Sequence, residues 1–302
     1  MQTLFPFIAV MIWSGNMLVN RMAVGVIVPG DISFYRWLVA GLVLTPMCWP
    51  ALRRNRQQIV ANLGKLFVLS LFGMVLYPSI AYVAALSISA GQSGVILGLF
   101  PVFTLVLGRL IFKQSISAIG TIGAVISLLG VSIFVSKGSP VNLFHEHIAV
   151  GEGWMIIAVL CYAFYSLLLK HWQSSIALPV WVSLNVQVLC TILLLSPIFW
   201  VFGEHSFNSH ALGLVGYAGV IASLGAPYCW MRGVALLGAP KASIFMNFLP
   251  ILSAIMAYVL LGETLSSIQL AAGAIILLGV SLTQAPGEWL FKRLTMMRRR
   301  VA

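Results

Sequence analysis

The chain has 302 residues, of which 61% are hydrophobic and only 8% are charged, and its mean hydropathy is +1.04. Because a soluble domain carries about 25% charged residues, this composition excludes an ordinary water-facing surface. A formal net charge of +11 would suggest nucleic-acid binding in a soluble protein, but here the cations fit the short connections of a membrane protein, so no nucleic-acid partner is expected.

Long apolar runs recur along the whole chain, and about 20 such residues cross a bilayer. They predict an all-α membrane protein with ten transmembrane helices, at 4–24, 32–51, 66–88, 92–112, 118–136, 152–170, 179–201, 211–235, 242–261 and 268–284. The first run has no basic segment before it, so we expect a retained helix rather than a cleaved signal peptide.

The distribution of cations predicts the orientation. They cluster in every second connection and at the end of the chain, at Arg53, Arg54, Arg56, Lys65, Lys113, Lys292, Arg293, Arg298, Arg299 and Arg300. The positive-inside rule then places these segments and both termini in the cytoplasm. We expect an integral protein of the inner or plasma membrane, surrounded by membrane lipids.

The chain also contains an internal repeat. Four positions, Pro78, Pro101, Gln114 and Gly130, recur 149 residues later as Pro227, Pro250, Glu263 and Gly279. Five spans per half are an odd number, so the second half must insert upside down relative to the first. The prediction is therefore two inverted five-helix repeats, 1–136 and 152–284, joined by the 137–151 loop and followed by a basic cytoplasmic tail at 285–302.

Several segments carry a family resemblance: "IWSGNMLVNR" (12–21), "FYRWLVAGLVLTP" (34–46), and "LFPVFTLVLGRLIFKQSIS" (99–117) with its mate "FLPILSAIMAYVLLGETLS" (248–266). In order, spacing and duplication the chain resembles the EamA branch of the drug/metabolite transporter superfamily. The resemblance implies ten helices in inverted repeats with cytoplasmic termini, a central cavity lined mainly by spans 1, 3, 4, 6, 8 and 9, and usually export of small metabolites. Members of that family move amino acids, other metabolites or nucleotide sugars. Lys113-Gln114 departs from the usual glycine-glutamate turn, which Gly262-Glu263 keeps.

Charged residues inside a bilayer are costly and are therefore candidates for function. Arg21 and Lys170 are repeat mates (170 − 21 = 149) at opposite membrane faces. They could serve two gates or attract an anionic group, or they could extend to lipid headgroups. Arg232 follows Pro227, and it could contact a substrate carboxylate or anchor the inner end of its helix.

Aromatic and amide side chains recur on the spans that the resemblance places at the cavity. The candidate substrate-binding residues are Trp13, Asn16, Tyr77, Tyr82, Tyr162, Tyr165, Tyr228, Trp230, Arg232 and Asn247. The aromatic residues could equally form packing contacts or interfacial belts, and the amides could form hydrogen bonds between helices. The paired prolines, Pro78, Pro101, Pro227 and Pro250, could act as hinges or as fixed kinks.

Motifs of catalysis are not evident in the sequence. It contains no HExxH, no GxSxG and no glycine-rich phosphate loop, so no enzyme and no cofactor are expected. His145, Glu146 and His147 could hold a metal but fit an ordinary solvated loop, and no metal site is predicted. No Asp or Glu lies near the middle of a predicted span, which favours uniport or exchange over strict proton coupling.

The sequence thus predicts a secondary transporter that exports small metabolites, amino acids or related amphipathic solutes first, by alternating access through a central cavity. A lipid or lipid-linked sugar translocase is one alternative, and a non-transport receptor or structural membrane protein is another. The oligomeric state is left open, and a monomer is compatible with the sequence.

Overall fold

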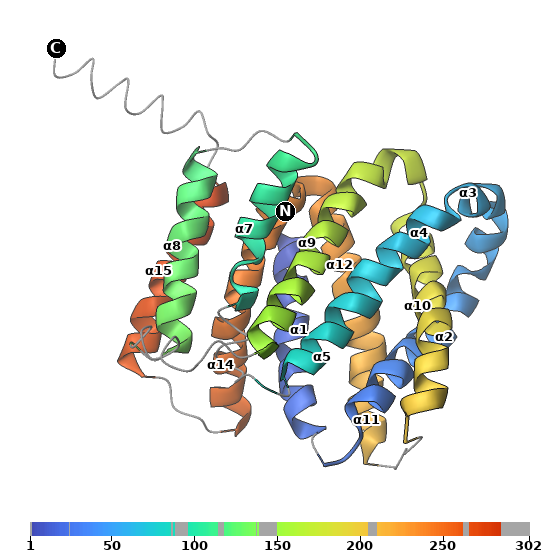
Figure 1. Ribbon diagram of the computed structural model, residues 1–302, viewed down its shortest axis with the longest axis horizontal. Coiled ribbons are helices and arrows are strands. Elements are labelled where there is room, and N and C mark those ends of the chain that lie inside the picture. Colours follow the sequence, from blue (N-terminus) through green and yellow to red (C-terminus); the bar gives the residue numbers. More distant parts are fainter. Residues whose placement is uncertain are drawn as a thin grey trace.

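The computed structural model describes residues 2–284 except 24, 86, 88–95, 114–117, 137, 139–149, 205–209 and 262–265. Within these residues every regular element is a helix (Figure 1). The 285–302 tail and nearly all of the 137–151 loop, including the His145–His147 segment, lie outside the described residues, as do Gln114 and Glu263.

Three of the predicted spans, 66–88, 211–235 and 242–261, are divided into shorter helical pieces. The first half contains α1 (Leu4–Met22), α2 (Pro29–Arg54), α3 (Arg56–Ala61), α4 (Leu63–Ser70), the π-helix η1 (Leu71–Leu76), α5 (Tyr77–Ala85), α7 (Phe100–Leu110) and α8 (Ala118–Val135). The second half contains α9 (Val150–Ile176), α10 (Val180–Phe202), α11 (Ala211–Gly216), the π-helix η3 (Tyr217–Gly225), α12 (Ala226–Leu237), α13 (Ala239–Ser243), the 3-10 helix η4 (Ile244–Phe248), α14 (Leu249–Leu261) and α15 (Ser267–Gln284).

Six of the described helical stretches are long and apolar enough to cross a membrane: Gly30–Arg54, Arg56–Ala81, Val150–Ile176, Val180–Val201, Ala211–Leu237 and Ala239–Met256. Four shorter apolar helices, Leu4–Val19, Phe100–Leu110, Ala118–Phe134 and Ser267–Leu282, occupy the remaining predicted spans. Many large apolar side chains point outward, such as Leu42, Met47, Leu193 and Val259. An outer surface of this kind suits lipid rather than water.

The two halves are interleaved rather than separated into lobes (Figure 1). Helix α1 packs on α12 and α14, while α9 of the second half packs on α5 and α7 of the first. Helices α2 and α10 also pack together. Each half therefore supplies one side of most of the interfaces, and the centre of the molecule is built from both.

The contact between α8 and α15 reveals the symmetry of the two halves. A Cβ on Gly130 of α8 would lie 2.9 Å from the backbone nitrogen of Ile276 on α15, and a Cβ on Gly279 would lie 2.5 Å from that of Ser127. Gly279 is the mate of Gly130, and Ile276 is the mate of Ser127 (276 − 127 = 149). Such a reciprocal contact is the mark of a two-fold relation. The pairing runs from 127 to 130 on one helix and from 279 to 276 on the other, so the two helices are antiparallel.

The matched prolines stand where the helix geometry changes. Pro78 is the second residue of α5, which follows the π-helix η1, and Pro227 is the second residue of α12, which follows η3. A proline lacks an N–H and its ring crowds the carbonyl four residues earlier, and a widened π-helical turn relieves this crowding. Pro101 lies in the first turn of α7, where a missing N–H costs little, and Pro250 follows the 3-10 turn of η4.

We predict that Gly279→Ala destabilises the protein by about 1–3 kcal/mol, because the added methyl group meets backbone atoms of Ser127 and Gly123 that cannot rotate away. The matched control is Gly153→Ala in α9, where a Cβ meets nothing within 4 Å and alanine favours the helix. The free energy of unfolding in detergent micelles or lipid discs measures both changes. Equal effects at the two sites would contradict the close packing of α8 on α15.

Candidate functional site

Six aromatic side chains, called here the central aromatic cluster, meet where the two halves interleave. They are Trp13 on α1, Tyr77 on α5, Phe100 on α7, Tyr162 and Tyr165 on α9, and Trp230 on α12. The first three belong to the first repeat and the others to the second. Five of the six are residues that the sequence analysis proposed for the cavity.

Tyr162 is the hub of this cluster. Its ring centroid lies 4.6 Å from that of Tyr77, 5.3 Å from Phe100, 5.4 Å from Tyr165 and 5.8 Å from Trp230. These separations fall in the range at which aromatic pairs attract one another beyond their buried area. The side chains of Tyr162, Tyr165, Trp230 and Phe100 are all at most 4% exposed, so the centre of the molecule is closed in this conformation.

The contact between Trp13 and Tyr162 locates the cluster relative to the symmetry of the fold. The two residues are repeat mates (162 − 13 = 149), and their ring centroids are 6.1 Å apart in an edge-on arrangement. A residue that touches its own mate must lie close to the axis that relates the halves. The contact between Trp13 and Tyr162, and with it the central aromatic cluster, therefore lies close to the local two-fold axis.

Polar groups are held inside this aromatic centre. The indole N–H of Trp230 donates a hydrogen bond of 3.2 Å to Oγ of the fully buried Ser166. Tyr77, Tyr162 and Tyr165 add phenolic hydroxyl groups to the cluster. Ring faces with a few hydroxyl groups can take up the apolar body and the polar end of a small organic molecule.

Phe100 is the member of the cluster that the sequence analysis missed. It is fully buried, and its ring lies 5.3 Å from that of Tyr162 and 5.8 Å from that of Trp230. A usable signal was present, since Phe100 directly precedes Pro101 on a span that the family resemblance places at the cavity. The sequence analysis considered only Tyr and Trp as cavity aromatics.

Other predicted residues lie away from the central aromatic cluster. The ring of Tyr228 stacks on Trp181 of α10 at 4.0 Å. Arg232 is exposed, with its guanidinium 5.6 Å from the ring of Phe5 near the start of the chain. Asn247 is buried and donates a hydrogen bond of 2.8 Å to Oγ of Ser127 on α8.

The remaining candidates are only partly placed. Asn16 lies buried on α1, one turn after Trp13. Arg21 and Tyr82 belong to α1 and α5, but their side chains lie outside the described residues.

Lys170 ties two helices of the second repeat together. Its Nζ donates hydrogen bonds to the carbonyl oxygen of Ala235 on α12 and, at 3.3 Å, to Oε1 of Gln173 on α9. A charge-assisted hydrogen bond of this kind is stronger than a neutral one. Lys170 therefore fastens the last turns of α9 to the last turns of α12.

Acidic groups stand at helix ends in the described part of the chain. Asp31 lies in the first turn of α2, Glu152 in the first turn of α9, and Glu204 just after α10. Among the described residues no group of three or more His, Cys, Asp or Glu side chains could hold a metal ion. The chemistry available at the centre is thus aromatic and hydroxylic rather than ionic.

We predict that Ser166→Ala destabilises the protein by about 1–3 kcal/mol, because the indole N–H of Trp230 would be left buried without its acceptor. Ser281→Ala is the matched control, since the exposed Ser281 hydroxyl bonds only to the carbonyl of its own helix at Leu277. Thermal unfolding in detergent measures both variants. A control that lost as much stability as Ser166→Ala would refute this role for the buried hydroxyl.

Comparison with known proteins identifies the family. The model of the EamA-like transporter family matches residues 2–136 and 149–284. An uncharacterized transporter of Archaeoglobus fulgidus is 25% identical over 72% of this chain and 76% of its own length. The uncharacterized transporter YyaM of Bacillus subtilis is 21% identical over 86% of each chain.

Two further matches extend the same picture. A chloroplastic WAT1-related protein of Arabidopsis thaliana is 24% identical over 91% of this chain and 67% of its own. A solved crystal structure shares the fold with a TM-score of 0.74 at 18% identity, covering 97% of this chain and 98% of the other. The family resemblance seen in the sequence is confirmed: the chain belongs to the EamA-like transporter family of the drug/metabolite transporter superfamily and is an integral membrane protein.

Proposed function

We propose that this protein is a secondary transporter that exports small metabolites, amino acids or related amphipathic solutes first among them, by alternating access. In this proposal ten spans form two inverted five-helix repeats, 1–136 and 152–284, in the inner or plasma membrane with both termini in the cytoplasm. Family membership supports transport of small solutes across a bilayer. The substrate class, the direction of transport and the mechanism are what we propose beyond family membership.

The position of the central aromatic cluster on the local two-fold axis is the observation that carries the proposal. In transporters built from inverted repeats, the substrate site lies near the bilayer midplane where the repeats meet. Trp13, Tyr77 and Phe100 come from one repeat and Tyr162, Tyr165 and Trp230 from the other. A relative movement of the repeats would part these rings and open the space between them to a solute.

The chemistry of the cluster favours amphipathic organic solutes. We assign substrate contact to Trp13, Tyr77, Tyr162, Tyr165 and Trp230, with Asn16 as a polar contact one turn beyond Trp13. The roles proposed for the other candidates follow their surroundings: an aromatic stack for Tyr228, an anchor at the inner membrane face for Arg232, and an interhelical hydrogen bond for Asn247.

Movement between the repeats needs points where the helices can bend. The π-helical turns before Pro78 and Pro227 and the geometry changes at Pro101 and Pro250 supply such points in matched places. Lys170 would serve the gate at one end by holding α9 and α12 of the second repeat together through Ala235. Its mate Arg21 would serve the opposite end.

We expect Tyr162→Leu to lower solute flux by about tenfold or more, since it removes the ring that contacts the other cluster members while keeping an apolar side chain. Tyr258→Leu on α14 is the matched control, because Tyr258 is 55% exposed and does not belong to the central aromatic cluster. The protein is overexpressed in cells, metabolites in the medium are compared, and the solute found is then measured in proteoliposomes.

Each outcome of this comparison decides between functions. Accumulation lost in Tyr162→Leu and retained in Tyr258→Leu supports an exporter with its site at the central aromatic cluster. Equal flux in both variants would remove the cluster from the site. Lipid movement without solute flux would favour a translocase of lipids or lipid-linked sugars, and no flux of either kind would favour a non-transport role.

Uniport or exchange is the energy mode we propose, because the described carboxylates of Asp31, Glu152 and Glu204 lie at helix ends rather than in the aromatic centre. Solute flux in proteoliposomes is therefore expected to continue when the pH gradient is collapsed, and Asp31→Asn should leave the number of protons moved per solute unchanged. A fixed proton stoichiometry that Asp31→Asn abolishes would overturn this mode.

A further inference from the structure

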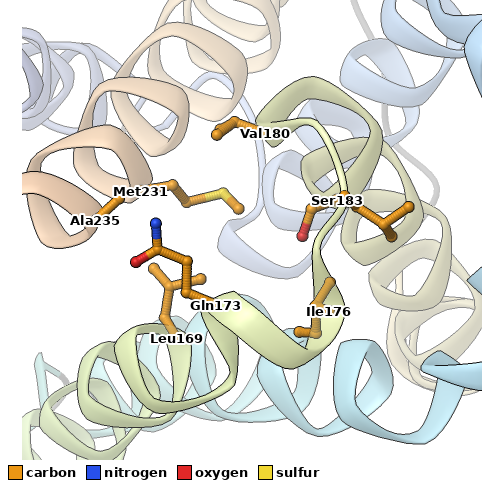
Figure 2. Close-up of a pocket in the computed structure, with 8 residues that line it drawn as sticks. Leu169, Gln173, Ile176, Val180, Ser183, Met231 and Ala235 are labelled. Atoms are coloured by element: carbon orange, nitrogen blue, oxygen red, sulfur yellow. The ribbon is translucent and has the colours of Figure 1, made fainter. Parts of the chain in front are cut away.

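A cavity opens between the last turns of α9, the first turns of α10 and the last turns of α12. None of the six residues of the central aromatic cluster lines it. Figure 2 shows its walls, which come entirely from the second repeat, at the end of the helices that the predicted orientation places toward the cytoplasm.

One wall of the cavity presents an amide that Lys170 orients. The ammonium of Lys170 donates to Oε1 of Gln173 and to the carbonyl of Ala235, and both of these residues line the cavity. Because an ammonium group can only donate, the carbonyl end of Gln173 must face it. The NH₂ group of Gln173 is then directed into the opening, as Figure 2 shows.

The opposite wall offers a second donor. Oγ of Ser183 accepts a hydrogen bond of 3.2 Å from Nε2 of the fully buried Gln187, which leaves the proton of the Ser183 hydroxyl to be donated elsewhere. The lining residues include no Asp or Glu. The polar groups of the cavity are therefore donors next to a cation, an arrangement that suits a ligand group made only of acceptors.

The rest of the lining is apolar. Leu169, Ile176, Leu178, Val180 and Met231 surround the two donors. The cavity also lies at the start of α10, whose positive dipole end carries no side-chain cap and favours a negative group nearby. Two donors that face each other among apolar side chains match a molecule with an anionic end and a hydrocarbon part.

We propose that this cavity binds short amphipathic carboxylates, with the carboxylate held by Gln173, Ser183 and the charge of Lys170 and the hydrocarbon tail against Leu169 and Met231. It would be a loading site on the cytoplasmic side, an assignment that rests on the proposed transport function and names a substrate class for it. Binding itself does not require that the protein transports the ligand.

The test uses hexanoate as the probe and the full-length protein in discs of phosphatidylcholine, with affinity measured by isothermal titration calorimetry. Hexylammonium and 1-hexanol test the need for negative charge, and acetate tests the need for the tail. We expect hexanoate to bind roughly tenfold or more tightly than hexylammonium and 1-hexanol, the difference that one charge-assisted hydrogen bond supplies. It should also exceed acetate roughly tenfold or more, because acetate lacks the methylene groups that hexanoate buries against the apolar walls.

Three variants assign the binding to this cavity. Lys170→Met should weaken hexanoate binding roughly tenfold or more, and Lys170→Arg should recover part of the loss. Met231→Trp should block binding by filling the cavity while leaving every charge in place. The control is Lys241→Met, an exposed lysine on α13 that does not line the cavity, and it should bind hexanoate like the unaltered protein.

The results separate this proposal from the proposed function. Hexanoate binding that survives both Lys170→Met and Met231→Trp, or equal binding of hexanoate and hexylammonium, overturns the site. If Lys170→Met fails to fold, Met231→Trp alone decides. Binding that follows the expected pattern without any hexanoate flux would keep the site and count against transport of this solute, whereas flux without binding at this cavity would keep the transporter and discard the site.

Discussion

Reciprocal contact between equivalent positions of the two repeats is the constraint on which the rest of this structure depends. Gly130 and Gly279 let α8 and α15 approach until backbone meets backbone, and Trp13 and Tyr162 meet their own mates at the centre. In lipid, small residues at such crossings give packing that the hydrophobic effect cannot supply between apolar helices. The same relation that holds the halves together also places the aromatic centre on their shared axis.

The helical architecture follows from the solvent, and its irregularities follow from the sequence. A bilayer offers backbone groups no partner, so the chain satisfies them within helices. The departures from regular α-helix fall at matched places, since the π-helices end just before Pro78 and Pro227 and the 3-10 turn of η4 precedes Pro250. The chain therefore combines two kinds of helix. The pair α8 and α15 is regular and tightly packed, whereas the helical stretches that contain η1, η3 and η4 change their geometry along their length.

Composition and the constant offset of 149 residues were enough to predict the helical membrane class and the duplication, and the resemblance of segments such as 99–117 and 248–266 predicted the family. Spacing along one helix could not show which face turns inward, so the sequence grouped Tyr228 and Asn247 with Tyr162 although they pack against Trp181 and Ser127 instead. Phe100 was overlooked because a phenylalanine in an apolar span gives no local signal of its position. The cavity beside Lys170 was also invisible, since its walls come from three helices that meet only in the folded chain.

Alternating access around the central aromatic cluster is the claim that gives these parts one function, and a distance measurement between the repeats tests it most directly. Spin labels are attached to Gln57→Cys in α3 and Lys241→Cys in α13, in a chain whose four native cysteines are replaced. Double electron–electron resonance then measures the distance between the two labels, one on each repeat. The account predicts two distance populations whose ratio shifts when the transported solute is added. A single distance that does not change with solute would contradict it.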